Sequence, residues 1–244
     1  MAENTQPTIA IIGLGYVGLP LAILAAEKGY PVIGLDIDQN KVDKINQRRA
    51  PMSEPGLQEK LNTTTLTAST DFSEVAHSQI IIICVPTPVK EHHIPDLGPV
   101  RGACRLITPY LKAGQLVILE STVNPGVCDE VVIPLLENET GMSAGKDFYV
   151  AHCPERINPG VSTWSKGYSV GNIPRVVGAT DPIGLEMALH FYRSIIDAEI
   201  KPMANLKEAE AVKIVENAFR DVNLAFVNEL AQSFSKLGID IEHV

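Results

Sequence analysis

The sequence predicts an α/β fold, in which a doubly wound and mostly parallel sheet is followed by one long amphipathic helix. Short apolar runs alternate with helix-like segments from residue 9 to residue 202, which is the order of a parallel sheet with crossover helices. Apolar residues then recur at helical spacing from residue 205 to residue 237. We therefore expect a first domain over residues 1–204, and the long helix with the start of a second domain over residues 205–244.

The first strand–helix–strand unit contains a glycine motif. Gly13, Gly15 and Gly18 form G-x-G-x-x-G directly after the apolar run that starts at Ile9. In such a motif the first glycine allows a tight turn, the second lets the backbone approach a pyrophosphate, and the third lets the helix pack close to the strand. The helix that follows directs its N-terminal N–H groups at the phosphates. This context favours a Rossmann-like dinucleotide site over an ordinary glycine turn.

An acidic residue, Asp36, ends the next apolar run. A carboxylate at this position accepts hydrogen bonds from the hydroxyls of the adenosine ribose. The same charge repels a 2′-phosphate, so we predict NAD rather than NADP as the cofactor.

Two further strands read as buried on both faces, because they are continuous apolar runs: Gln79–Val85 and Gln115–Glu120. Loops rich in Pro, Ser and Thr follow each of them, at the end of the sheet where α/β folds bind ligands. The remaining elements expected are short strands over Leu61–Ala68, Phe148–Ala151, Arg175–Gly178 and Glu199–Pro202, and helices over Gln39–Arg49, Asp96–Leu111, Val127–Leu136 and Pro182–Ile195.

Composition narrows the class of protein. The 244 residues are 45% hydrophobic and 20% charged, values that are ordinary for a globular chain, and the net charge is −9 without a basic stretch. This charge argues against nucleic acid or an acidic membrane as the main partner. No secretion signal and no apolar run of membrane-spanning length is present, and the four cysteines form no C-x-x-C pair, so we expect a cytoplasmic protein with reduced thiols. The adjacent His92 and His93 lack further ligands, and we predict no metal site.

Five features in order resemble the UDP-glucose/GDP-mannose dehydrogenase family over essentially the whole chain. They are GLGYVG, VPTP, STVNPG, CPERINPG and, on the long helix, Lys213 with Asn217. The form PERINPG is most similar to the branch that acts on UDP-N-acetylhexosamines (UDP-N-acetylmannosamine and UDP-N-acetylglucosamine 6-dehydrogenases). Pro159 agrees with this branch, since UDP-glucose enzymes carry a second carboxylate at that position.

The resemblance implies a reaction and the residues that serve it. The family oxidises the C6 alcohol of the sugar to a carboxylate with two NAD, through an intermediate on cysteine, and dimerises through the long helix. By resemblance, Thr122 and Glu155 hold and activate a water, while Lys213 and Asn217, four residues apart on one helical face, stabilise the anionic oxygen at C6. The residues matching the family's cofactor site are Gly13, Gly15, Tyr16, Val17, Gly18, Asp36, Pro86, Thr87 and Thr122.

The resemblance also implies a cysteine nucleophile, in a G-G-H-C segment after the long helix. This sequence ends at Val244 without that segment. Of the cysteines present, Cys84 and Cys104 fall in buried elements and are expected to be inert, and Cys153 lacks the preceding glycines. Cys128 falls near a helix N-terminus, a position that can lower a thiol pKa, but nothing aligns it with the nucleophile. We therefore expect a chain that binds NAD without completing the four-electron oxidation alone.

Other interpretations remain open at this point. Lys213 can instead pair with Glu210 or Glu216 on a solvated helix face, and Glu155 with Arg156 can be a surface pair. The β-hydroxyacid dehydrogenases also combine a dinucleotide unit with a Lys and an Asn on a long helix, and oxidise a secondary alcohol without cysteine. A third interpretation is a non-catalytic module that binds NAD and pairs subunits.

Overall fold

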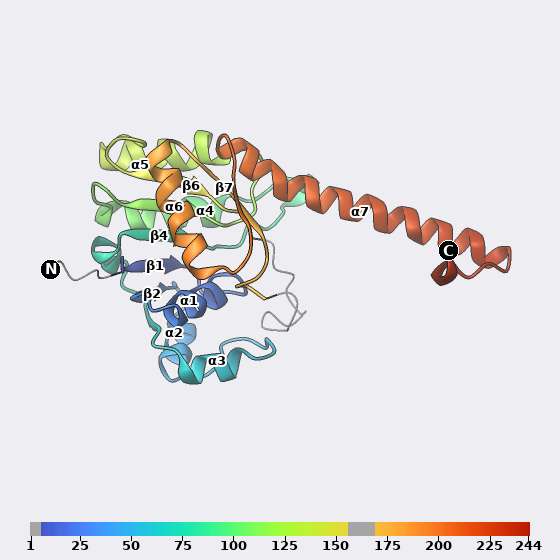
Figure 1. The fold of residues 1–244 in the computed structure, drawn as a ribbon. Helices are drawn as coiled ribbons and strands as arrows, with labels where there is room; N and C mark the ends of the chain where they lie inside the picture. Colours follow the sequence, from blue (N-terminus) through green and yellow to red (C-terminus); the bar gives the residue numbers. More distant parts are fainter. Residues whose placement is uncertain (1–5, 156–168) are drawn as a thin grey trace.

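The computed structural model describes residues 6–155 and 169–244, and Figure 1 shows their arrangement. The strands of this part form a single eight-stranded sheet in the order β3-β2-β1-β4-β5-β6-β7-β8, parallel except between β6 and β7. The strands are β1 Ile9–Ile12, β2 Val32–Leu35, β3 Thr67–Ser69, β4 Ile80–Ile83, β5 Leu116–Leu119, β6 Tyr149–His152, β7 Arg175–Ala179 and β8 Ile200–Pro202.

Helices connect these strands and cover both faces of the sheet (Figure 1). The α-helices are α1 Gly18–Glu27, α2 Gln39–Asn46, α3 Leu57–Thr63, α4 Gly98–Ile107, α5 Ile133–Thr140, α6 Pro182–Ile195 and α7 Leu206–Lys236. Short 3₁₀ turns are η1 Phe72–His77, η2 Glu91–His93, η3 Thr108–Tyr110 and η5 Ile241–His243, and a π-turn, η4 Cys128–Val132, leads into α5.

Alternate strand residues supply two separate cores, because successive side chains point to opposite faces of a sheet. Ile9 and Ile11 of β1 join one buried cluster with α1 and α6, while Ala10 and Ile12 join the other with α4 and α5. All four β1 residues are at most 2% exposed. The continuous apolar runs of the sequence are therefore explained by helices packed on both faces.

The order of the strands reverses between β1 and β4. From β1 the chain proceeds outward through β2 and β3, and then returns to β4 on the other side of β1. In open α/β sheets such a reversal leaves a crevice at the carboxyl ends of the two strands, where ligands bind. The glycine motif follows β1 and therefore lies at this crevice.

The predicted fold class is confirmed, with three local differences. Helix α3 was not predicted, and it forms because apolar Leu57 and Leu61 lie one helical turn apart and are both buried. The strand expected over Leu61–Ala68 is therefore limited to β3. The helix expected over Val127–Leu136 begins as a π-turn and continues to Thr140. The pairing of β7 antiparallel to β6 was not predicted, since strand direction depends on the connection that precedes β7.

The long helix is confirmed almost to the residue. Asn205 accepts a hydrogen bond from the Glu208 N–H, which caps the first turn, and Gly238 ends the helix with a positive φ of 72°. Leu206 and Ala209 are buried against the sheet domain, whereas the rest of α7 projects away from it (Figure 1). Among the described helices none combines the length and the apolar content needed to cross a bilayer.

Candidate cofactor site and active site

The three glycines of the motif have different surroundings. Gly13 has a φ of +92°, and a Cβ there would lie 2.8 Å from the Cys84 carbonyl oxygen. A Cβ on Gly18 would lie 2.0 Å from the Gly13 carbonyl oxygen, whereas a Cβ on Gly15 would meet no atom within 4 Å. Gly13 and Gly18 are thus required by packing, while Gly15 leaves open space where a ligand can approach the backbone.

That open space belongs to a cavity of about 790 Å³ along the carboxyl ends of β1, β2, β4 and β5. Nine of the ten residues that the sequence predicts for the cofactor and water sites border this cavity, and the tenth, Gly18, packs against the Gly13 carbonyl beneath the turn. The nine are Gly13, Gly15, Tyr16, Val17, Asp36, Pro86, Thr87, Thr122 and Glu155, joined by further lining residues that include Lys41 and Glu120.

At one end of the cavity, Asp36 is held by several hydrogen-bond donors. Its Oδ2 accepts a hydrogen bond from the Leu14 N–H at 2.8 Å and pairs with Lys41 Nζ at 2.6 Å, and its Oδ1 accepts one from the Asp38 N–H at 3.0 Å. Burial raises the pKa of Asp36, but Lys41 and the two N–H groups outweigh it, so the net pKa lies below the usual 3.8. The carboxylate is ionised and fixed, as a ribose acceptor requires. Lys41 offsets part of its charge, which the sequence analysis did not anticipate.

At the other end of the cavity, side chains tie the loops after β4 and β5 together. The Thr87 hydroxyl donates a hydrogen bond to the Thr122 carbonyl at 2.7 Å, and the Ser121 hydroxyl donates one to the Val85 carbonyl at 2.7 Å. Thr87 and Thr122 thereby border one continuous space together with Glu155, which follows β6. The rest of the PERINPG loop, with Arg156 and Pro159, lies outside the described residues.

Glu155 belongs to a buried group of ionisable side chains, which we call the Arg175 cluster: Glu120, Glu155, Arg175 and Tyr192. Arg175 Nη1 lies 3.0 Å from Glu120 Oε1, and Arg175 Nη2 lies 2.9 Å from Glu155 Oε2. The Tyr192 hydroxyl donates a hydrogen bond to Glu120 Oε1 at 2.5 Å. Glu155 is only 5% exposed, so the alternative that it forms a surface pair is wrong.

Burial sets the charges of this cluster. The pKa of Glu120 is raised to about 7, chiefly by burial. The attraction of Arg175 lowers this pKa, and the repulsion of Glu155 raises it. Burial disfavours the charge on Arg175, but Glu155 and Glu120 outweigh it and hold its pKa well above the usual value. The guanidinium therefore stays charged while Glu120 titrates near neutral pH.

Glu120, Arg175 and Tyr192 were not predicted from the sequence as parts of the site. Glu120 and Arg175 each stand at one end of an apolar strand run, and a charged residue in a run buried on both faces needs a partner. A charged residue at the end of an apolar strand run could therefore have been recognised for both residues as a sign of a buried partner, and their pairing with each other could not be recognised from the sequence. The reason is that 55 residues separate Glu120 from Arg175 along the chain.

Two predicted catalytic residues, Lys213 and Asn217, do not border the cavity. They lie on α7 beyond its buried first turns, Lys213 half-buried and Asn217 exposed. Glu210, one turn before Lys213, is fully buried, and its carboxylate accepts hydrogen bonds from the N–H groups of Gly126 at 2.6 Å and Cys128 at 2.8 Å. The structure thus gives Glu210 a role in anchoring α7 to the loop that contains Thr122.

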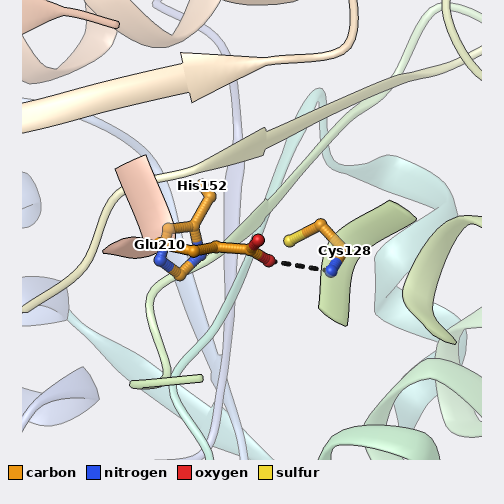
Figure 2. A group of neighbouring side chains, drawn as sticks. All are labelled: Cys128, His152 and Glu210. Carbon is orange, nitrogen blue, oxygen red and sulfur yellow. Dashed lines mark hydrogen bonds between the residues drawn. The ribbon is translucent and has the colours of Figure 1, made fainter. Parts of the chain in front are cut away.

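Figure 2 shows this anchor, in which Glu210 lies between Cys128 and His152. Ligand atoms of the three side chains lie within 4.8 Å of one another. Burial raises the pKa of the Cys128 thiol well above its usual value, and Glu210 raises it further, so the position near a helix N-terminus does not lower it. Burial lowers the pKa of His152 to about 3. A protonated thiol and a carboxylate already engaged by two N–H groups favour a packed anchor over a metal site.

The other cysteines follow the prediction. Cys84 and Cys104 are buried, and burial raises the pKa of both thiols, that of Cys104 to about 12. Cys153 is also buried and has its pKa raised to about 12 by burial. Each of the four thiols is therefore protonated at neutral pH and poorly suited to act as a nucleophile.

Comparison with known proteins gives the same assignment along the chain. Residues 7–196 match the NAD binding domain of the UDP-glucose/GDP-mannose dehydrogenase family, and residues 207–244 match its central domain. A UDP-N-acetyl-D-glucosamine 6-dehydrogenase from Pseudomonas aeruginosa is 39% identical over 236 residues, which are 97% of this chain and 55% of that protein. The chain thus spans about half the length of the curated relatives it matches.

Solved structures agree with the sequence matches. A UDP-D-ManNAc dehydrogenase from Pyrococcus horikoshii superposes with a TM-score of 0.88 at 37% identity, covering 97% of this chain and 56% of that one. A GDP-mannose dehydrogenase from Pseudomonas aeruginosa, solved as a ternary complex, gives a TM-score of 0.87 at 33% identity, covering 96% and 55%. Since the family model of the NAD binding domain matches well over half of the chain, this protein belongs to the UDP-glucose/GDP-mannose dehydrogenase family.

Proposed function

We propose that this chain is the cofactor-binding part of an NAD-dependent 6-dehydrogenase acting on a UDP-N-acetylhexosamine, UDP-N-acetylmannosamine or UDP-N-acetylglucosamine. The observation that carries the proposal is the single cavity joining the glycine turn and Asp36 to Thr122 and Glu155. Relatives from three organisms have names that specify these two sugars. The PERINPG loop supports the same branch.

NAD fits the residues present. The open space at Gly15 admits a pyrophosphate against the backbone, and the N-terminus of α1 faces it. Asp36, ionised and fixed, would accept hydrogen bonds from the ribose hydroxyls. When bound, NAD would supply the hydride acceptor for the alcohol. Tyr16, Val17, Pro86 and Thr87 would line its path from the pyrophosphate to the nicotinamide.

The protein's own side chains would handle water and charge. We assign Thr122 and Glu155 to holding and activating a water, since both border the cavity and Glu155 is fixed by Arg175. We assign Lys213 and Asn217 to the anionic oxygen at C6. They share one face of α7, and Glu210 fixes the start of that helix to the Thr122 loop.

Gly15→Val tests the cofactor site. The new side chain meets no protein atom within 4 Å at its Cβ, so the fold should survive while the pyrophosphate position is filled. We expect NAD affinity to fall at least about tenfold, with an unchanged unfolding midpoint, by calorimetric titration and thermal melting. Ala113→Val, at an exposed position beyond the amino end of β5, is the control. Equal NAD affinity in Gly15→Val and wild type would contradict the site.

Substrate identity is tested by NADH formation. The chain is supplied with NAD and, in separate assays, with each of the two acetamido UDP-sugars, with UDP-glucose and with a short hydroxyacid. Each assay is run with the chain alone and with the chain mixed with a fragment of the Pseudomonas aeruginosa relative that covers the part this chain does not span. We expect NADH only in the mixture and only with an acetamido sugar. Oxidation of short hydroxyacids instead would support a β-hydroxyacid dehydrogenase, although the family match argues against it. NAD binding without turnover in any mixture would support a non-catalytic module.

We also propose a homodimer through α7, a domain boundary near residue 204 and a cytoplasmic location. Apolar side chains of the helix stay exposed in the single chain, Phe219 at 71% and Val222 at 67%, which is the surface a second copy would cover. The four free cysteines accord with a reducing compartment. Sedimentation of the chain tests the dimer.

A further inference from the structure

The Arg175 cluster holds one guanidinium against two carboxylates at the far end of the proposed NAD site, and this inference rests on the proposed function. A dinucleotide with its ribose at Asp36 and its pyrophosphate at Gly15 extends its nicotinamide toward the end bordered by Glu120, Thr122 and Glu155. The charge of the cluster therefore lies beside the ring whose own charge changes. The nicotinamide ring is cationic in NAD⁺ and neutral in NADH.

The geometry gives the cluster two charge states. Arg175 is fixed by both carboxylates, at 3.0 Å from Glu120 and 2.9 Å from Glu155, and is 1% exposed. With both carboxylates ionised the three groups sum to −1, and with a proton on Glu120 they sum to zero. Glu120 is fully buried, so water does not screen the difference between these states.

The groups facing Glu120 come from every element around it. Arg175 of β7 and the Tyr192 hydroxyl of α6 stabilise its charged form, whereas Glu155 after β6 opposes it. The Cys84 thiol, after β4, lies 4.0 Å from Glu120 Oε2, and the Cys153 thiol lies in the same buried region. Burial raises the pKa of both thiols and of the Tyr192 hydroxyl, so these groups stay protonated near neutral pH, whereas the pKa of Glu120 is about 7 and lets it exchange a proton there.

We propose that the Arg175 cluster senses the redox state of the cofactor, Glu120 releasing its proton when NAD⁺ binds and retaining it when NADH binds. In this step, the protein with protonated Glu120 binds NAD⁺, Glu120 becomes ionised, and one proton is released to solvent. A cationic ring favours the −1 state of the cluster, and a neutral ring leaves the uncharged state favoured. Glu120 therefore does not react with the substrate. Its protonation sets the net charge of the cluster beside Glu155.

Proton release on binding tests the proposal directly. NAD⁺ and NADH are titrated into the 244-residue chain near pH 7 in buffers of different ionisation enthalpy. Because the pKa of ligand-free Glu120 is about 7, NAD⁺ should release up to about half a proton per site, and NADH much less. Across the neutral range NAD⁺ affinity should rise with pH by up to about tenfold for each unit by which binding lowers the pKa.

Two variants and a control locate the proton. Glu120→Gln should abolish the difference in proton release between NAD⁺ and NADH. Tyr192→Phe keeps every charge and removes a hydrogen bond that lowers the pKa of Glu120, so it should move the midpoint to higher pH. Glu186→Gln, an exposed change on α6, should behave as wild type. An infrared difference spectrum should show loss of the carboxylic acid band on NAD⁺ binding in wild type and in Glu186→Gln, and this wild-type signal tests the proposal even if Glu120→Gln folds poorly.

The outcomes separate the two proposals. If neither nucleotide binds, the proposed cofactor site is wrong and the inference fails with it. If both bind with equal proton release, or if Glu120→Gln retains the difference, the cofactor site stands and only the inference is overturned.

Discussion

The two ends of helix α7 differ in their surroundings, although one helix contains both. Its first turns are built into the sheet domain, where Leu206, Ala209 and Glu210 are at most 2% exposed. Farther along, Val215, Phe219 and Phe226 are 60–71% exposed. The apolar stripe of the sequence thus consists of two surfaces. One packs against the sheet domain and stabilises the fold, and the other stays exposed, as a surface that binds a partner does.

The anchored end is also the polar end. Glu210 accepts two backbone hydrogen bonds from the loop of Thr122, and α7 lies so close to β7 that a Cβ on Gly178 would come within 2.3 Å of the Asn205 carbonyl oxygen. The projecting end has many apolar side chains and few contacts with the domain. Helical spacing alone therefore does not distinguish a surface that stabilises the fold from one that awaits a partner.

Gly178→Val should have the largest effect, because it forces α7 away from β7. The close contact is with backbone, which cannot give way as a side chain can. We expect a loss of about 3 kcal/mol or more in the free energy of unfolding, measured with urea. Gly102→Ala, where a Cβ meets nothing within 4 Å, is the control and should stay within about 1 kcal/mol. Similar stability of both variants would show that the anchor does not depend on this contact.

Acid should weaken the anchored end through His152. Burial lowers the folded-state pKa of His152 to about 3, so between that value and 6.5 the unfolded chain binds more protons and stability falls as pH falls. We expect a loss of about 2 kcal/mol for this residue between about pH 6 and pH 4.5.

The pH dependence of the free energy of unfolding is compared between wild type and His152→Gln. The comparison is needed because Glu120, whose folded-state pKa is raised to about 7, makes stability rise as pH falls between 7 and 4.5. Subtracting the two pH profiles removes that contribution. A profile unchanged by the substitution would mean that His152 is not buried as a neutral ring.

Glu210→Gln should cost less, because the amide oxygen still accepts one of the two backbone hydrogen bonds. We expect the free energy of unfolding to fall by about 1.5 kcal/mol, because a neutral acceptor replaces a charged one and one N–H is left unpaired. Glu229→Gln, on the exposed part of α7, is the matched control and should stay within about 0.5 kcal/mol. Equal effects in urea unfolding would refute the anchor.

The projecting end should give the smallest effect on folding. Phe219→Ser with Phe226→Ser changes side chains that are 71% and 60% exposed, so the unfolding free energy of the monomer should move by about 0.5 kcal/mol or less. Sedimentation should instead show lost self-association. A large loss of monomer stability would mean that these side chains fold back on the domain.

Local sequence was sufficient for most of the architecture. The apolar runs predicted the central strands, the glycine motif predicted the turn after β1, and Asn205 with Gly238 predicted the limits of α7, because each signal acts within a few residues. The cavity-lining residues of the loops after β1, β4 and β5 were predicted because parallel strands bring their carboxyl ends together, although Glu120, directly after β5, was missed.

What the sequence could not supply was contact between distant residues. It gave no sign that Lys41 would pair with Asp36, that Arg175 would clamp Glu120 and Glu155, or that Glu210 would hold the Thr122 loop. The sequence by itself determined the order of the elements, the dinucleotide turn and the helical stripe, which depend on local spacing. Only the tertiary structure decided which charges are buried together and which part of the stripe is covered, because burial and pairing depend on packing between segments far apart in the chain.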